Sequence, residues 1–271
     1  MQAFTPAPGR MAIVGEPMEL LAFAVWCFLV AFAGGLVGLV LGNIRLPATL
    51  LVTQSAAAGT GANLIISAAA AGTASIAHIR AGRVNWPLFW WMAPPSIAGA
   101  LLGGYVSGVI DERLLLLSIA AVLLYSGLDL LRWKPRPAAP ADATGAPPAP
   151  ALHRRAAVIS GALIGLLGGL VGLILGTLRV PALIRWVGET PQRAVGTNVC
   201  VGVCVGIAGA IGHLPSQAPD WTVAAVGVGA SIPGALLGSR LTGRLSDAQL
   251  IRAIAVILLV AATAMVVQAL S

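Results

Sequence analysis

Two stretches of this chain have nearly the same sequence. Residues 34–48 read GGLVGLVLGNIRLPA and residues 168–182 read GGLVGLILGTLRVPA, an offset of 168 − 34 = 134 residues. The offset becomes 135 further along, where His78 matches His213 (213 − 78 = 135). The chain therefore consists of two related copies of one folding unit.

The composition places both copies in a lipid bilayer. Hydrophobic residues make up 58% of the chain and charged residues 9%, with a mean hydropathy of +0.92. Soluble domains are about 25% charged. Internal duplication is also common among secondary transporters, whose substrate sites lie near the bilayer midplane between the repeats. Solute transport is therefore the first functional hypothesis.

The positive charge does not indicate a nucleic-acid-binding protein. The formal net charge is +7, but the arginines are scattered singly over loops and span ends, as expected for cytoplasmic loops. The single lysine, Lys134, lies in Trp-Lys-Pro, so the chain has no Gly-Lys-Ser/Thr phosphate-binding loop. We expect no nucleic-acid partner, no ATPase activity and no lysine-bound cofactor.

The hydrophobic runs predict an all-α polytopic membrane bundle of about eight helices. A membrane helix needs about 20 mostly apolar residues. We expect an N-terminal tail (1–17), a first four-helix repeat (18–132), a Pro/Ala-rich linker (133–153) and a second four-helix repeat (154–271). The expected spans are 18–42, 56–79, 87–110, 113–132, 155–177, 192–212, 221–244 and 248–270.

Orientation follows from the distribution of arginine and lysine. Basic residues flank the linker and follow the second span, which favours a cytoplasmic linker and cytoplasmic termini; Arg240, Arg244 and Arg252 argue the opposite way. Four spans in each half would make the repeats parallel, whereas one re-entrant segment in each half would make them inverted. We favour the parallel arrangement.

The two similar stretches, 34–48 and 168–182, each contain Gly-x-x-Arg-x-Pro near their ends, at Gly42–Pro47 and Gly176–Pro181. A glycine-rich helix end before a helix-stopping proline predicts a broken helix, whose free N–H groups suit an anion. Arg45 and Arg179 offer planar guanidinium groups that match an oxyanion. We therefore propose Gly42, Gly176, Arg45 and Arg179 as substrate-binding residues. The alternative is that both arginines extend to the lipid headgroups from a helix end.

Polar residues at the start of the next span in each half extend this candidate site. Thr60, Asn63, Thr197 and Asn198 lie where unpaired helix N–H groups collect. They are candidates for hydrogen bonds to a substrate, and helix capping is the alternative.

His78 and His213 lie at the far ends of these spans and are candidates for proton coupling. An interfacial histidine is the alternative. Cys200 and Cys204 lie four residues apart without a second Cys/His pair, so we expect no metal site and no cofactor. The glycine pairs Gly99/Gly103 and Gly234/Gly238 fit helix packing alone.

The order of these motifs, present twice, resembles the TauE/SafE family of sulfite exporters and related anion permeases. The motifs are the glycine-rich helix end leading to a proline, the threonine-containing segment, the histidine near a span end and a tryptophan-led span. The resemblance covers nearly the whole chain outside the first residues and the linker. It implies secondary transport of small, often sulfur-containing anions.

Two departures from the family pattern occur in both halves. Members commonly carry three glycines before the proline, whereas only Gly42 and Gly176 remain here. The position two residues before the proline is usually apolar, but it is Arg45 or Arg179 in this chain. Both changes suggest a specialised site for a more highly charged or bulkier anion.

We therefore expect a multi-pass protein of the bacterial inner or plasma membrane that transports a small anion by alternating access. Sulfite, a sulfonate, sulfoacetate and thiosulfate are the expected substrates. The sequence leaves open whether the protein forms a homo-oligomer. The alternative is a membrane-embedded assembly or maturation factor that binds a partner protein without moving a solute. We do not expect an enzyme, because acidic residues are almost absent from the spans.

Overall fold

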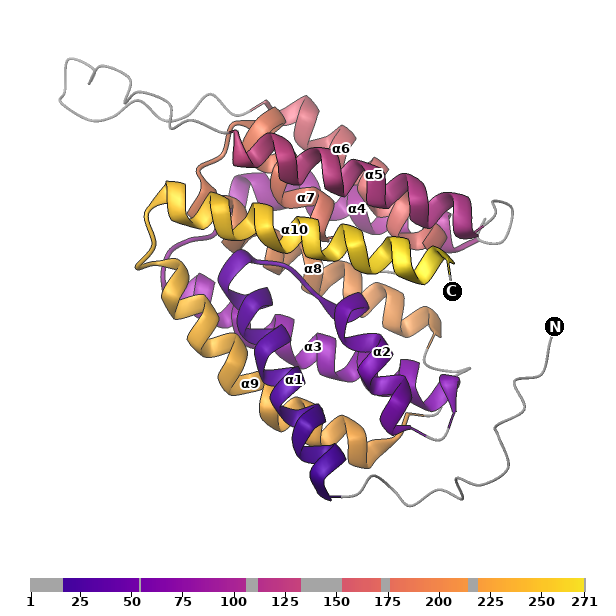
Figure 1. Ribbon diagram of the computed structural model, residues 1–271. Coiled ribbons are helices and arrows are strands. Elements are labelled where there is room, and N and C mark those ends of the chain that lie inside the picture. The colour runs from indigo at the N-terminus through magenta and orange to yellow at the C-terminus, as the bar shows by residue number, and fades with distance from the viewer. Residues whose placement is uncertain are drawn as a thin grey trace, which may run out of the picture.

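Helices are the regular secondary structure of the described part of the chain. The computed structural model describes residues 17–53, 55–105, 112–132, 153–171, 176–213 and 219–270, which form ten α-helices, one π-helical turn and no strand (Figure 1). The helices are α1 Pro17–Val37, α2 Gly42–Val52, α3 Ala56–Arg80, α4 Trp86–Tyr105, α5 Glu112–Leu131, α6 Arg154–Val171, α7 Gly176–Ala182 followed by the π-helical turn η1 Leu183–Val187, α8 Pro191–His213, α9 Trp221–Thr242 and α10 Asp247–Leu270. The expected tail and linker fall, apart from Pro17 and His153, outside the described residues.

The helix number differs from the eight that we predicted, because the first and fifth predicted spans end early. Helix α1 stops at Val37, where Gly38 adopts φ +71° and the Leu39 N–H donates to the Gly34 carbonyl at 2.9 Å. A left-handed glycine with this hydrogen bond is a Schellman C-cap. The chain then reverses into the short helix α2, and α7 with η1 occupies the matching place in the second half.

The prolines do not stop the helices as we predicted. Pro47 lies inside α2 and Pro181 inside α7. Each lies five residues after its helix begins (47 − 42 = 5; 181 − 176 = 5), so it removes at most one hydrogen bond near a helix start. In the second half the helix continues into the π-helical turn η1. The break in the first half precedes the Gly-x-x-Arg-x-Pro motif.

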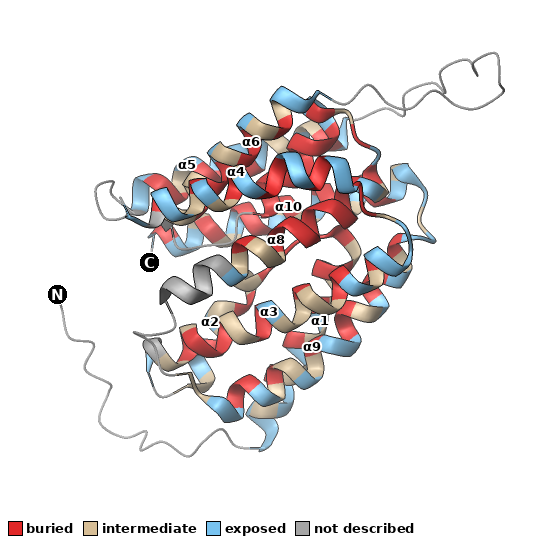
Figure 2. Cartoon of the chain, turned by 180° about the vertical axis from the view of Figure 1, so that it is seen from behind, coloured by how far each residue is buried: buried red, intermediate tan, exposed pale blue. Residues whose placement is uncertain are grey.

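Five described helices, α1, α3, α5, α9 and α10, are long and apolar enough to cross a membrane. Large apolar side chains such as Leu51, Tyr105 and Trp90 are exposed on the surface. Figure 2 shows exposed residues along the outer sides of the helices and buried residues facing inward. This distribution suits a bundle that is surrounded by lipid.

Two helix pairs cross between the sequence halves through matching glycines. Gly238 of α9 lies against the Phe32 backbone of α1, and Gly103 of α4 lies against the Leu166 backbone of α6. These contacts correspond, since 103 + 135 = 238 and 32 + 134 = 166. In both pairs the helices run in the same direction. The glycines therefore allow close backbone packing, as their four-residue spacing predicted.

Helices α5 and α10 hold matching places in the two halves and run in opposite directions. Gly127 of α5 lies against Leu259 of α10, and the Arg113 Nε donates to the Ala269 carbonyl at 2.7 Å. A symmetry that reverses one of two matching helices inverts the repeat. The structure therefore differs from the parallel arrangement that we favoured. The additional helices α2 and α7 bring each half to five described helices, and an odd number makes corresponding helices of the two halves run in opposite directions.

Substituting Gly238 with alanine is expected to destabilise the protein by about 1–3 kcal/mol, because the new Cβ would overlap the Phe32 carbonyl. Gly229 on the same helix has open space at its Cβ position, so Gly229→Ala is the matched control. Thermal unfolding in detergent measures both. Equal melting temperatures for the two variants would contradict the close packing of α1 and α9.

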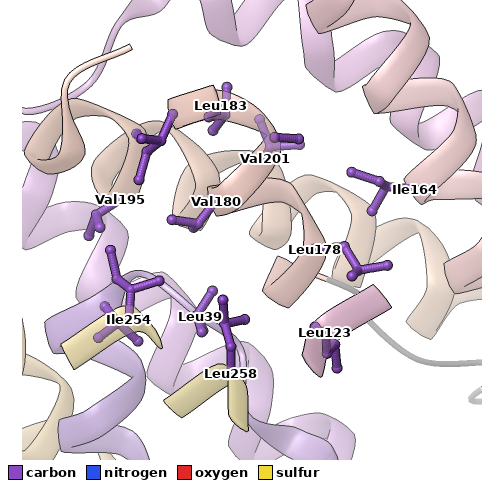
Figure 3. Packing of buried hydrophobic residues seen from close by; sticks show 14 of the residues in the cluster. Leu39, Leu123, Ile164, Leu178, Val180, Leu183, Val195, Val201, Ile254 and Leu258 are labelled. Atoms are coloured by element: carbon purple, nitrogen blue, oxygen red, sulfur yellow. The ribbon is translucent and has the colours of Figure 1, made fainter. Parts of the chain in front are cut away.

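The largest buried cluster lies where α7, η1 and α8 meet α10. Leu178, Leu183, Val201 and Leu258 belong to it, and Figure 3 shows their side chains between these elements. Every residue of α7 is buried. The core therefore holds the Arg179 segment inside the bundle.

One end of the bundle, which we call the linker end, gathers the ends of α3, α5, η1 and α9 with the starts of α4, α6, α8 and α10. Contacts across it include the Arg83 Nη1 donating to the Ser239 carbonyl at 2.7 Å and the Gln192 Nε2 donating to the Leu245 carbonyl at 3.2 Å. The opposite end joins α5 to α10, and it joins α9 to α3 through the Asp220 N–H and the Ala58 carbonyl. In Figure 1 the C-terminus lies at this opposite end.

Candidate functional site

Arg45 is buried on α2 and is held by α3. Only 2% of the residue is exposed. Its Nε donates to the Asn63 Oδ1 at 2.9 Å, and its Nη2 donates to the Asn63 carbonyl at 3.1 Å and to the Ser67 Oγ. The Asn63 Nδ2 in turn donates to the Gly42 carbonyl at 3.1 Å. Arg45, Asn63, Ser67 and Gly42 thus form one hydrogen-bonded group, the Arg45 cluster.

Arg179 repeats this arrangement in the second half. It is 1% exposed, and its Nη1 donates to the Asn198 Oδ1 at 3.2 Å. The Asn198 Nδ2 donates to the Gly176 carbonyl at 3.1 Å, as Asn63 does to Gly42. Since 63 + 135 = 198, the two asparagines hold matching positions. Arg179, Asn198 and Gly176 form the Arg179 cluster.

The two clusters differ in how completely the guanidinium is satisfied. Ser67 accepts a hydrogen bond from Arg45, but the matching residue on α8 is Gly202 (67 + 135 = 202). In the described structure the Arg179 Nε is buried without a hydrogen-bond partner, and so is the Thr177 Oγ1 on the same helix. A buried donor without a partner costs about 1–3 kcal/mol. Arg179 therefore has hydrogen-bonding capacity left for a ligand.

Neither arginine is neutralised by a described acidic residue. The ion pair within the described ranges joins Arg185 and Asp129, which are both partly exposed. Insertion scales place the cost of an arginine at the centre of a membrane helix at about 2.5–3.5 kcal/mol. Two such residues at matching positions leave the interior with positive charge that an anion would offset.

The segment 38–41 contacts both clusters. The Gly38 carbonyl accepts from the Asn198 Nδ2 at 2.6 Å, and Val40 lies beside Gly176. Residues 39–41 also line a cavity of about 20 Å³ together with Arg45 and Val199. A cavity of this size holds about one water molecule. The two guanidinium groups therefore lie in adjacent clusters, each bonded to the asparagine of its own half, and do not share one hydrogen-bonded pocket.

Both asparagines lie at the same distance from opposite ends of the bundle. Asn63 is seven residues after the start of α3 (63 − 56 = 7), and Asn198 is seven residues after the start of α8 (198 − 191 = 7). At 1.5 Å per residue, each lies about 10 Å from its end. The clusters are thus staggered in depth along the bundle.

The structure places the two predicted threonines differently. Thr60 is partly buried and lies one turn before Asn63. Thr197 is buried, and its Oγ1 accepts from the Asn85 N–H at 2.9 Å, so it joins α8 to the start of α4. Ser67 was missed, although its spacing from Asn63 (67 − 63 = 4) places it on the same face of α3.

His78 is fully buried at the end of α3, against α1. Its Nε2 lies 3.2 Å from the Gly35 carbonyl of α1, and its Nδ1 has no partner in the described structure. The side chain of His213 lies outside what the structure describes. Within the described ranges, no three His, Cys, Asp or Glu side chains gather in a group that could hold a metal ion.

Comparison with known proteins gives one consistent family. The family model described as sulfite exporter TauE/SafE matches residues 23–265. The probable membrane transporter protein YunE of Bacillus subtilis (strain 168) is 25% identical over 244 residues, covering 83% of this chain and 87% of its own length. A probable membrane transporter protein of Xylella fastidiosa (strain 9a5c) is 29% identical over 227 residues, covering 79% and 84%. No solved structure matches the chain.

These relatives and the apolar helices indicate a multi-pass protein of the cell membrane. The matched region contains α2, α3, α7 and α8, which carry both arginine clusters. The chain belongs to the TauE/SafE family of membrane transporters.

Proposed function

We propose that this protein is a secondary transporter of a small oxyanion, which binds between the Arg45 and Arg179 clusters. The observation that carries the proposal is the pair of buried arginines at matching positions, neither in an ion pair with a described acid. In other membrane proteins such charges mark substrate pathways. The substrate would supply the missing negative charge.

The chemistry of the clusters favours an oxyanion over a simple halide. A guanidinium presents donors in a planar fork that binds two oxygens of one group. The free Arg179 Nε and the Thr177 hydroxyl add two donors on one short helix. Sulfite, named in the family description, and the related sulfonates and thiosulfate have oxygens spaced for such contacts.

The conformation described here is closed around the arginines. The cavity beside Arg45 is about 20 Å³, which is room for one water molecule and too small for an anion of several atoms. Substrate entry therefore requires the segment 38–41 to move away from Asn198 or Arg45. Inverted halves allow such a movement to open one end of the bundle at a time, which is the alternating-access mechanism.

Flux in proteoliposomes tests the proposal. Vesicles containing the purified protein are loaded with unlabelled sulfite, sulfoacetate or thiosulfate, and entry of the labelled anion is followed against protein-free vesicles. We expect counterflow of at least one of these anions at about tenfold or more above the protein-free rate, and no comparable flux of a neutral sulfur compound of similar size. Flux of none of the three anions would contradict the proposal.

A further inference from the structure

Glu189 is a buried carboxylate outside the arginine clusters. It lies at the linker end between η1 and α8 and is 3% exposed. Its Oε1 accepts from the Thr190 N–H at 2.9 Å and from the Thr190 hydroxyl at 3.4 Å, and its Oε2 accepts from the Asn85 Nδ2. Both carboxylate oxygens thus accept hydrogen bonds from neutral donors.

No described cation pairs with this carboxylate, although several lie on the elements around it. Arg83 donates to the Ser239 carbonyl, Arg154 lies over the Trp91 ring, and Arg185 pairs with Asp129. Partial burial also lowers the pKa of Arg83 from its ordinary value. The buried His78 at the end of α3 contacts the Gly35 carbonyl of α1 instead. The other charged or titratable side chains described at the linker end are exposed; they are Arg80, Arg132, His153, Arg155, Arg193, Arg240, Arg244, Asp247 and Arg252. Among the described residues, Glu189 is therefore a buried carboxyl group whose hydrogen-bond partners, Asn85 and Thr190, are neutral.

The hydrogen bonds of Glu189 lead to the Arg179 cluster. Asn85 donates to Glu189 through its side chain and to the Thr197 hydroxyl through its N–H. Thr197 directly precedes Asn198, which accepts from Arg179. Asn85 also caps α4, since its Oδ1 accepts from the Leu88 N–H at 3.2 Å. The hydrogen bonding of Glu189 is thus linked to the contact between α4 and α8 at Thr197, one residue before Asn198, which accepts from Arg179.

The matching position at the other end of the bundle carries no acid. Since 189 − 135 = 54, Glu189 corresponds to Gln54, which lies outside the described residues. Asn85 corresponds to Asp220 (85 + 135 = 220), whose carboxylate accepts from the N–H groups of Thr222 and Val223 and so caps its own helix α9. The buried, uncompensated carboxylate is therefore a feature of the linker end.

We propose that Glu189 is the proton-binding residue that couples anion movement to a proton gradient, an inference that rests on the proposed transport function. A proton from the aqueous phase binds one carboxylate oxygen, which becomes an O–H donor and displaces the Asn85 or Thr190 donor it had accepted. Loss of the side-chain bond from Asn85 loosens the start of α4 from the η1–α8 connection, while the Asn85 N–H still donates to the Thr197 hydroxyl of α8. The linker end then opens with the proton and the anion bound together.

The test compares two kinds of flux for the wild type, Glu189→Gln and Asp220→Asn in the same proteoliposomes. Accumulation of labelled thiosulfate is driven by acid outside, with the voltage clamped at zero by potassium and valinomycin. For one proton per anion we expect about tenfold accumulation per pH unit in the wild type. Counterflow at equal pH on both sides measures transport without net proton movement.

We expect Glu189→Gln to lose the accumulation while keeping at least about half of the counterflow, because glutamine fills the same space without a titratable proton. Asp220→Asn, which removes an acid from the opposite end, and Glu189→Asp, which keeps a titratable carboxyl, are expected to accumulate thiosulfate. Accumulation by Glu189→Gln at the wild-type level would overturn the proposal. Loss of its counterflow together with its accumulation would assign Glu189 a structural role and overturn it too.

The two proposals fail in different ways. Wild-type counterflow without any accumulation on an acid gradient would leave transport standing and overturn proton coupling through Glu189. Absence of counterflow for all the anions would overturn both.

Discussion

Alanine in place of Arg179 is expected to lower anion counterflow about 100-fold or more. Truncating one partner of a buried, hydrogen-bonded charge pair costs 2–5 kcal/mol, and about 3 kcal/mol corresponds to roughly 100-fold. The same loss is expected for Arg45→Ala. Lysine should restore little at either position, because a single ammonium cannot reproduce the planar fork. Initial rates of counterflow, with an anion for which wild-type transport saturates, measure the effect.

The stability of these variants separates a binding role from a structural one. Arg45 makes three hydrogen bonds to Asn63 and Ser67, so Arg45→Ala leaves buried polar groups unsatisfied and should lower the melting temperature. Among the described residues, the Arg179 Nη1 donates to Asn198 while its Nε has no partner, so Arg179→Ala should melt near or above the wild type.

Arg252→Ala serves as the control for these substitutions, because it removes the same charge from an exposed position at the linker end. It is expected to keep the wild-type rate. Wild-type counterflow in both Arg45→Ala and Arg179→Ala would show that the substrate binds elsewhere, even if transport itself stands.

A reporter fused after Leu270 is expected to lie outside the cell, and one inserted in the linker between 133 and 152 is expected to lie in the cytoplasm. Basic residues near span ends are retained in the cytoplasm. Nearly all of the described basic residues near span ends lie at the linker end, whereas Arg113 lies at the opposite end. The linker-end residues are Arg80, Arg83, Arg132, Arg154, Arg155, Arg185, Arg193, Arg240, Arg244 and Arg252.

Alkaline phosphatase, which is active only outside, and green fluorescent protein, which fluoresces only inside, measure this orientation. Phosphatase fused at the C-terminus and fluorescent protein inserted in the linker should both be active. Each signal should be at least about tenfold higher than that of the same reporter at the other position. Fluorescence from the C-terminal fusion would contradict the orientation. This expectation differs from the cytoplasmic termini that the sequence favoured, because an inverted repeat places the linker and the termini at opposite ends.

The conflict among the arginines disappears for the same reason. With four spans in each half, Arg240, Arg244 and Arg252 would face away from the linker. In the structure the α9–α10 turn lies at the linker end, where Gln192 contacts Leu245. The short helices α2 and α7 each add one change of chain direction to their half, and this brings all these arginines to the linker end.

The sequence alone determined the membrane class and the duplication, and it singled out two matching arginine positions. These depend on local composition and on self-similarity at a constant offset, which need no knowledge of distant contacts. The helical structure of the described residues is confirmed, and so is membership of the TauE/SafE family. The assignment of Arg45, Arg179, Asn63 and Asn198 to a substrate site stays a prediction.

Only the tertiary structure decided where the helices break and how the halves face each other. An apolar run reads as one span whether or not a glycine such as Gly38 reverses it, because hydropathy does not depend on φ. The direction of α10 against α5 and the burial of Glu189 beneath Asn85 depend on contacts between residues about 100 or more positions apart. Such contacts arise from packing of the whole bundle, and no local pattern in the chain specifies them.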